Sequence, residues 1–182
     1  MSSKMRRALG LGLASAVALA AAAARADTSG VAPGGFTSTF ALVVDADPGR
    51  VFQAFGQLPR WWSDDHTWSG RAANMSVDLQ AGGCWCERWG DGRSAMHGQV
   101  VLVQPGSVLR LNAALGPLQD MAVSGVLSFA TARRDGQTRL RVTYRVSGPA
   151  EAGLDKMAPQ VDAVIGTQVQ RLKAFIETGK PD

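Results

Sequence analysis

The C-terminal stretch 154–177 has the clearest periodicity in the chain. Its sequence, LDKMAPQVDAVIGTQVQRLKAFIE, places apolar residues three to four positions apart, a spacing typical of an amphipathic helix. The apolar positions are Leu154, Met157, Val161, Val164, Ile165, Val169, Leu172, Phe175 and Ile176. A helix with such a stripe needs a surface that covers it. The residues before it alternate in short segments, so we expect that surface to be a sheet.

Seven segments of the chain read as strands. Phe36–Val44 comes first and is followed by two short predicted helices, one starting at Asp47-Pro48 and one at 58–62. Six alternating segments then follow with turn residues between them, at 74–79, 84–89, 94–104, 108–113, 123–133 and 137–147. Strands with such short connections must be antiparallel, because parallel pairs need long crossovers. The order predicts an α+β domain in which one face of a curved antiparallel sheet packs on the last helix.

Residues 1–26 have the pattern of a secretory signal peptide. Lys4, Arg6 and Arg7 precede an apolar run at 8–23, and Ala24-Arg25-Ala26 is a small-x-small cleavage site. The run is shorter than the roughly 20 residues that span a membrane. We therefore expect an exported protein, periplasmic or secreted, without a membrane anchor after processing. Residues 27–35 are expected to be a flexible lead-in and 36–178 a single domain.

Processing also removes the basic excess of the chain. Four of the 19 lysines and arginines lie in residues 1–26, and none of the 15 acidic residues do. The expected mature chain therefore has no net charge. A surface that binds nucleic acid needs a basic excess, so we expect no nucleic-acid partner.

Three motifs, in this order, resemble a known family. They are DPGRVFQAFGQLPRWW at 47–62, GGCWCERWGDG at 82–92 and GQVVLVQPGSVLRL at 98–111. With the terminal amphipathic helix, they resemble the START-like (SRPBCC) superfamily, which includes polyketide cyclases, and within it the homologues of activators of a heat-shock chaperone ATPase. The resemblance implies a helix-grip fold, in which a seven-stranded sheet wraps around the last helix and encloses a cavity for an apolar ligand.

The strand at 84–89 carries the candidate acid–base residue. Alternation places Trp85, Glu87 and Trp89 on one face. We expect this face to line the cavity, because two exposed indoles would form an unusual apolar patch. Glu87 would then have a raised pKa and could bind or protonate a ligand. The alternative is a strand Glu paired with Arg93 or Arg110.

Alternation and aromatic content predict the remaining cavity residues. Two accounts are open for the tryptophans near the short helices. In one, Trp62 and Trp68 line the mouth of the cavity; in the other, Trp61 or Trp62 fills the gap between the short helices and the sheet. His97 is expected on the wet face or at the pocket rim. The expected ligand-binding set is Trp62, Trp85, Glu87, Trp89, Met96, Leu111, Phe129 and Tyr144.

Cys84 and Cys86 are the only cysteines. Alternate residues of a strand have Cα atoms about 6.5–7 Å apart, near the upper limit for a disulfide. A disulfide, two free thiols and a metal or intermolecular role all stay open at this stage. His66 and His97 lack the ligand spacing of a zinc site, so we expect no metal and no other cofactor.

Three functions remain for such a domain. The first is an exported, non-enzymatic protein that binds a small apolar or amphipathic ligand between sheet and helix. The second is an enzyme of the cyclase or hydratase type that uses Glu87 as general acid/base with His97 or Tyr144 assisting. The third is a protein interaction module without a ligand.

Overall fold

A computed structural model describes residues 25–182. The predicted signal peptide lies outside the described residues except for Arg25 and Ala26. Eight strands form one antiparallel sheet with the order β1-β2-β8-β7-β6-β5-β4-β3. The strands are β1 (Arg25–Ala32), β2 (Gly35–Val44), β3 (Met75–Val77), β4 (Cys84–Trp89), β5 (Arg93–Gln104), β6 (Val108–Asn112), β7 (Ser124–Arg134) and β8 (Gln137–Ser147).

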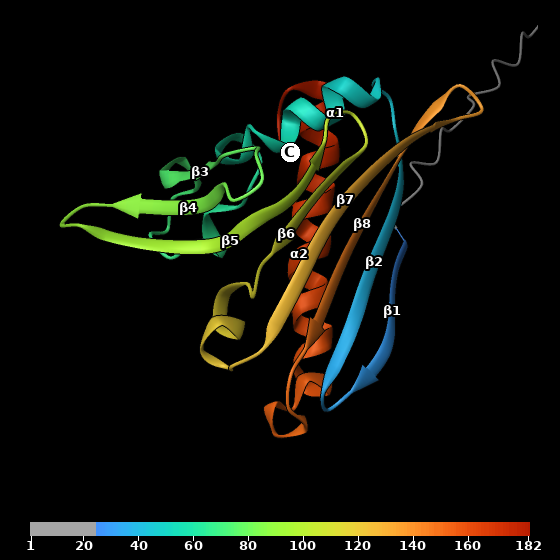
Figure 1. The fold of residues 1–182 in the computed structure, drawn as a ribbon. Helices are drawn as coiled ribbons and strands as arrows, with labels where there is room; N and C mark the ends of the chain where they lie inside the picture. The colour runs from blue at the N-terminus through green and yellow to red at the C-terminus, as the bar shows by residue number, and fades with distance from the viewer. Residues whose placement is uncertain (1–24) are drawn as a thin grey trace, which may run out of the picture.

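The helices lie on one side of this sheet. Within residues 25–182, two are α-helices, α1 (Pro48–Phe55) and α2 (Leu154–Thr178), and five are short 3-10 helices. The short ones are η1 (Leu58–Arg60), η2 (Asp64–His66), η3 (Ala72–Asn74), η4 (Gly116–Asp120) and η5 (Ala150–Ala152). In Figure 1, α2 runs along the face of β2, β8 and β7, whereas the β4–β5 hairpin extends away from α2. The predicted α+β helix-grip architecture is confirmed.

One prediction about the strands is wrong. Residues 27–35 were expected to be a flexible lead-in, but most of them belong to β1, which pairs antiparallel with β2 at one edge of the sheet. The sheet therefore has eight strands in place of seven. Within residues 27–32 of this strand no side chain is buried: Thr28 is half-buried and the other five residues are exposed. This part of the strand therefore has no alternating apolar pattern in the sequence. Backbone pairing holds it, and the Thr28 hydroxyl also donates to Asp162 of α2 over 2.9 Å.

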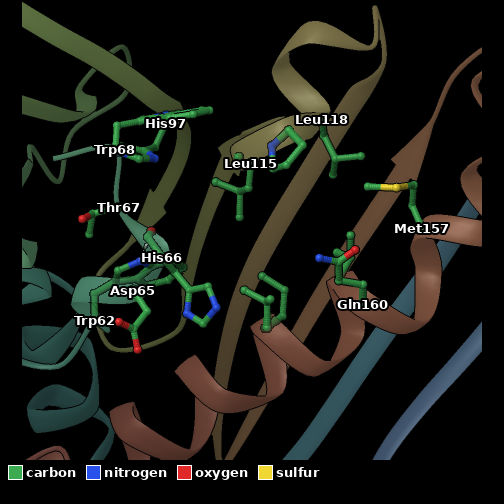
Figure 2. A pocket seen from close by; sticks show the side chains of 15 residues that line it. Trp62, Asp65, His66, Thr67, Trp68, His97, Leu115, Leu118, Met157 and Gln160 are labelled. Atoms are coloured by element: carbon green, nitrogen blue, oxygen red, sulfur yellow. Dashed lines mark hydrogen bonds between the residues drawn. The ribbon is translucent and has the colours of Figure 1, made fainter. Parts of the chain in front are cut away.

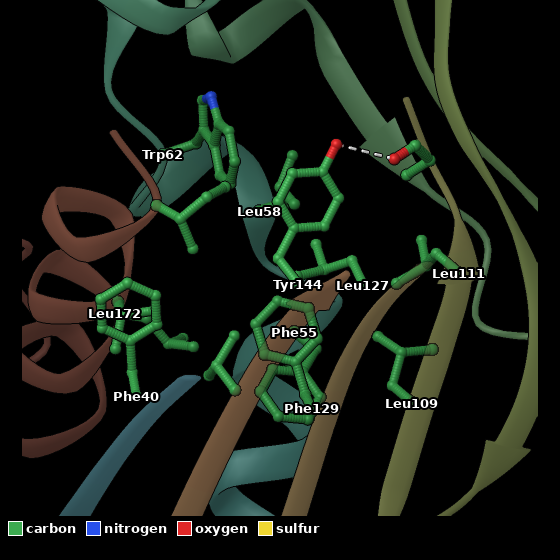
Figure 3. Packing of buried hydrophobic residues seen from close by; sticks show 14 of the residues in the cluster. Phe40, Phe55, Leu58, Trp62, Leu109, Leu111, Leu127, Phe129, Tyr144 and Leu172 are labelled. Carbon is green, nitrogen blue, oxygen red and sulfur yellow. Dashed lines mark hydrogen bonds between the residues drawn. The ribbon is translucent and has the colours of Figure 1, made fainter. Parts of the chain in front are cut away.

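Helix α1 forms where the sequence predicts it. The Asp47 carboxylate accepts a hydrogen bond from the Arg50 amide over 3.0 Å, and Pro48 occupies the first helical position. Both features suit a helix start, because Asp satisfies a free amide and Pro needs no amide partner. The helix buries Phe55, whose ring centroid lies 4.8 Å from that of Phe129 in β7 (Figure 3).

The space between the sheet and α2 is largely filled. Figure 3 shows Phe40, Phe129, Leu127 and Leu172 packed together there, and each is less than a tenth exposed. At Gly166 of α2, a Cβ atom would lie 3.2 Å from Cε1 of Phe40. The glycine therefore permits close helix–sheet contact and does not leave room for a ligand.

Candidate functional site

A cavity of about 340 Å³ lies beside the N-terminal half of α2. Three parts of the chain line it: one face of α2, the loop that follows η1, and η4 with the residue before it (Figure 2). Only one strand residue contributes. The lining residues are Trp62, Asp65, His66, Thr67, Trp68, His97, Leu115, Gly116, Pro117, Leu118, Met157, Gln160, Val161, Val164 and Ile165.

The apolar stripe of α2 is divided between two tasks. Its C-terminal half, with Leu172 and Ile176, is buried against the sheet. Met157, Val161 and Val164 are only partly buried and line the cavity. Figure 2 shows Met157 and Gln160 across the cavity from His97 and Trp68. The helix therefore supplies one apolar wall of the cavity as well as the central core.

The opposite wall at η4 is held in place by two side chains from the sheet and its own segment. The hydroxyl of Tyr144 in β8 accepts from the Leu115 amide over 3.0 Å and donates to the Ala113 carbonyl over 2.9 Å. The Gln119 side chain donates to the Met96 carbonyl over 2.8 Å. Tyr144 is fully buried, and this burial raises its pKa to about 12. It therefore acts as a neutral positioning group behind the cavity wall.

The loop at 62–72 supplies the polar side of the cavity. The Trp62 indole donates to the His66 carbonyl over 2.9 Å, and the Asp64 carboxylate accepts from the Ala72 amide over 2.6 Å. The loop is also tied to α2, because the Arg171 guanidinium donates to the Trp61 carbonyl over 2.9 Å. Most of the loop has no regular secondary structure, and these contacts hold it in place.

His97 reaches the cavity through a β-bulge. In the β4–β5 ladder Trp85 pairs with Gly98 and Cys86 pairs with Met96, so His97 is the additional residue. The bulge turns two consecutive residues, His97 and Gly98, toward the interior. Bulges often redirect a side chain in this way next to functional sites.

Glu87 stands directly behind His97. Its Oε2 lies 2.8 Å from Nε2 of His97, and the carboxylate also accepts from the backbone amides of Trp68 at 3.0 Å and Ser69 at 2.6 Å. Glu87 is fully buried and His97 is 4% exposed. The carboxylate is thus saturated with donors and does not itself line the cavity.

The raised pKa expected for Glu87 is wrong. Burial does act to raise the pKa of Glu87, but hydrogen bonds from Ser69, Trp68 and His97 together outweigh it and lower the pKa below its ordinary value. Alternation correctly predicts an interior Glu87, whereas the three donors come from residues that are distant along the chain. The alternative pairing with Arg93 or Arg110 is also absent, since Arg93 contacts Asp91 and Arg110 contacts Ser128.

Among the residues predicted to contact a ligand, Trp62 lines the cavity. Trp85, Leu111, Phe129 and Tyr144 are inside the protein but belong to the packed core. The reason is geometric: α2 and the loop at 62–68 cover the inner face of the sheet, and two voids found among these side chains measure only about 10 Å³ each.

Two other predicted ligand contacts lie away from the cavity. Met96 was expected to face inward, but it is 58% exposed. The extra residue at His97 puts the positions before the bulge out of step with those after it, so Met96 points away from the face on which Gly98 and Val100 are buried. Trp89 shares the face of Trp85, yet it lies at the tip of the hairpin, where the Arg93 guanidinium is 5.9 Å from its ring centroid.

The three tryptophans of the loop region have separate roles. Trp61 is 1% exposed and its indole donates to the Ala54 carbonyl over 2.8 Å, so it fills the gap between the short helices and the sheet. Trp62 packs edge-on against Trp85 with ring centroids 4.8 Å apart and also lines the cavity. Trp68 is half-exposed at the cavity margin. Trp61 therefore fills the gap between the short helices and the sheet, whereas Trp62 and Trp68 lie at the cavity.

Cys84 and Cys86 form a disulfide, with Cα atoms 5.4 Å apart. The separation estimated from a regular strand was too long. The observed distance lies within the usual disulfide range. Neither cysteine lines the cavity.

Sequence reasoning missed several lining residues. His66 was considered only as a metal ligand, and Gln168, which contacts it, was not considered. The signal was weak in both cases, because the contact joins residues 102 positions apart. Leu115 and Leu118, at η4, lie between the predicted strands 108–113 and 123–133 and were not predicted to line a cavity.

Two kinds of feature are absent from residues 25–182. No group of three or more His, Cys, Asp or Glu side chains there could hold a metal ion. No helix in this range is long and apolar enough to cross a membrane.

The comparisons with known proteins identify the fold. No family model and no curated protein matches the chain, but many solved structures do. A conserved protein of unknown function from Enterococcus faecalis is 13% identical, with a TM-score of 0.58, over 86% of this chain and 78% of that one. CalU16 from Micromonospora echinospora is 14% identical, with a TM-score of 0.53, over 86% of each chain.

A third similar structure is the Aha1 dimer from Colwellia psychrerythraea, which is 19% identical with a TM-score of 0.54. The match covers 79% of this chain and 98% of that one. These likenesses extend over most of the described residues and agree with the observed strand order and terminal helix. The chain has the START-like (SRPBCC) helix-grip fold.

Proposed function

We propose that the protein is an exported binding protein for a small apolar or amphipathic molecule. The observation that carries this proposal is the cavity beside α2, whose walls are apolar at Met157, Val161, Leu115 and Leu118. Its volume of about 340 Å³ lies at the small end of the range of about 300–1,000 Å³ for ligand sites. The expected ligand is therefore compact, with one or two rings or a medium-length chain.

The distribution of polar groups favours an amphipathic ligand. Asp65, His66 and His97 lie at the end of the cavity away from Met157 and the first turns of α2 (Figure 2). A ligand with an apolar body and a polar end matches this arrangement, because the body covers the α2 wall and the polar end meets the imidazoles. The half-exposed Trp68 is placed to contact the ligand at the margin.

The proposed location depends on the pattern at residues 1–26. A disulfide between Cys84 and Cys86 supports it, because disulfides persist in oxidising compartments and are rare in the cytosol. Expression of the full precursor in a secreting bacterial host tests it. We expect an exported chain that begins at Asp27, as measured by intact mass. A full-length chain retained in the cytosol would contradict export and would leave the cavity proposal in place.

Ligand binding is tested with a defined set of probes. Medium-chain fatty acids and bicyclic aromatic alcohols and acids are titrated against the processed protein, with tryptophan fluorescence and thermal shift as readouts. Fluorescence reports the site because Trp62 and Trp68 line it. A ligand at about 100 times its dissociation constant stabilises the folded state by about 2.7 kcal/mol.

A matched pair of variants shows whether binding occurs in this cavity. Val164→Trp places an indole into the cavity, whereas Ala163→Trp places the same side chain on the exposed face of α2. We expect loss of binding only in the first. If no probe binds the wild-type protein, or if both variants bind equally, the cavity is not a ligand site.

A further inference from the structure

We propose that His97 and Glu87 form a proton-transfer site, with His97 as the base that touches the substrate and Glu87 as its positioning residue. This inference depends on the proposed cavity as the place where the substrate binds. It goes beyond binding, since it assigns a reaction: removal of a proton from an acidic C–H group of a compact, largely apolar molecule. It also exchanges the roles of the two residues expected from the sequence.

The first argument is the direction of the hydrogen bond between the two residues. Glu87 accepts from the amides of Trp68 and Ser69, which favours the ionised carboxylate. A carboxylate has no proton to donate, so the 2.8 Å contact requires a proton on Nε2 of His97. In the neutral imidazole the lone pair is then on Nδ1.

The second argument is the position of that lone pair. Among the described residues Nδ1 of His97 has no hydrogen-bond partner, and it is not among the buried polar atoms without a partner. The ring as a whole is 4% exposed, yet it lines the cavity. The free nitrogen therefore meets the cavity and not the packed interior.

The third argument is that the ring is held rigidly. Trp85 stacks on it with ring centroids 5.5 Å apart and an angle of 29° between the planes. The bulge in β5 directs it inward, and Glu87 holds one nitrogen. A carboxylate that orients an imidazole and stabilises its charged form is the arrangement used by acid–base histidines.

The reaction balances without any further reactant. The substrate C–H bond breaks, its proton passes to Nδ1, and the electron pair stays with the substrate. The imidazolium that forms keeps its second proton on Nε2, against the Glu87 carboxylate. Asp65 and His66 are the other titratable groups that share the cavity, and Glu87 is the only carboxylate in contact with the ring among the described residues.

The test uses 5-nitrobenzisoxazole, a compact bicyclic compound. Loss of its ring C–H proton moves the electron pair into a new C–N π bond, the N–O bond breaks, and a coloured cyanophenolate forms. Binding is measured separately with 5-nitroindazole, which has a similar shape but no N–O bond to break. Turnover and occupancy of the cavity are thereby distinguished.

We expect turnover by the wild-type protein and a loss of about 100-fold or more in His97→Gln, the usual effect of removing a general base. Glutamine keeps an N–H donor for Glu87 and so preserves the fold. Val164→Trp provides a second test, because it blocks the cavity without changing the dyad. Arg88→Gln, an exposed neighbour of Glu87 on β4, should keep the wild-type rate.

Glu87→Gln tests the positioning role. We expect a rate about tenfold or more below wild type, and a midpoint of the rate against pH that moves to lower pH, since the imidazolium loses its carboxylate. A purely structural role of Glu87 would reduce the amount of folded protein without moving the midpoint.

Two results would overturn the inference. One is turnover by wild type that does not exceed that of His97→Gln. The other is turnover that survives in Val164→Trp. If 5-nitroindazole binds and turnover is absent, the cavity stands as a binding site and only the proton-transfer role fails.

Discussion

The side-chain amide of Gln168 in α2 donates a 2.9 Å hydrogen bond to Nδ1 of His66 across 102 residues of sequence. The orientation of this amide follows from its other contact, because its oxygen accepts from the Ser63 amide over 2.9 Å. Neutral His66 therefore carries its proton on Nε2. Of the two histidines that line the cavity, His66 can then donate from Nε2 and His97 can accept at Nδ1. A ligand that carries both an acceptor and a donor would match these two groups.

Replacement of Gln168 should loosen the loop that bears His66. Gln168→Leu leaves the Ser63 amide and His66 without partners, at a cost of about 1–3 kcal/mol in the free energy of unfolding. Chemical denaturation measures this cost, and hydrogen exchange at the Ser63 amide should become faster. Gln170→Leu, on the exposed face of the same helix, is the control and should change neither. Equal effects in the two variants would contradict a stabilising role for the contacts of Gln168 with Ser63 and His66.

Tyr144 is the single tyrosine of the chain, so tyrosinate absorbance reports it alone. We expect a midpoint near 12 in the folded protein, against about 10 in the unfolded chain. Because the folded pKa is raised, the associated stability is complete below pH 10 and is lost as the pH rises toward 12. A midpoint near 10 while circular dichroism remains native would contradict the burial of this hydroxyl.

Tyr144→Phe tests the support of the cavity wall. The Leu115 amide and the Ala113 carbonyl both lose their partner, which costs about 1–3 kcal/mol. Since Leu115 lines the cavity, ligand affinity should fall together with stability. Tyr144→Phe with unchanged affinity would show that the wall does not depend on this hydroxyl.

Acid titration should reveal the ionised Glu87. Its pKa is lowered in the folded state from the ordinary value of 4.5, so its contribution to stability is complete above pH 4.5 and is lost as the pH falls through the folded value. Glu87→Gln should be less stable than wild type by about 1–3 kcal/mol at neutral pH. Denaturation measured at several pH values should show this difference shrinking below pH 4.5. If the stability difference between wild type and Glu87→Gln instead grew in acid, the lowered pKa of Glu87 would be contradicted.

Gly166 should tolerate little added volume. A Cβ would lie 3.2 Å from the Phe40 ring, so Gly166→Leu forces the helix away from the sheet and costs about 1–3 kcal/mol. Ala163 lies about one helical turn before Gly166 on the exposed face of α2, so Ala163→Leu should be neutral or slightly stabilising. Thermal unfolding compares the two, and equal melting temperatures would show that α2 does not press on β2.

The disulfide should contribute little to stability. It closes a loop of only three residues, for which the chain-entropy model gives about 1.5 kcal/mol. We expect no titratable thiol in the exported protein and a small loss of stability in the Cys84→Ser/Cys86→Ser double variant. Two titratable thiols after purification under oxidising conditions would contradict the bond.

Local patterns determined most of the fold. The stripe at 154–177, the Asp47-Pro48 start of α1 and the alternation at 84–89 and 137–147 all correspond to observed elements. Each depends on short-range physics: a repeat of 3.6 or 2 residues, a capping side chain, or a turn too short for a parallel crossover. The exception is β1. It lies at the edge of the sheet and is held by backbone hydrogen bonds to β2, so the sequence at 27–32 has no side-chain pattern that would reveal it.

The site, in contrast, was decided by tertiary structure. A single extra residue at His97 exchanged the faces of His97 and Met96, and no periodicity reports a bulge. The saturation of Glu87 by the amides of Trp68 and Ser69, and the contact of Gln168 with His66, join segments that are far apart in sequence. Such contacts arise only when the loop at 62–72 folds between sheet and helix, since hydrogen bonds and burial depend on distances in space that alternation along the chain does not contain.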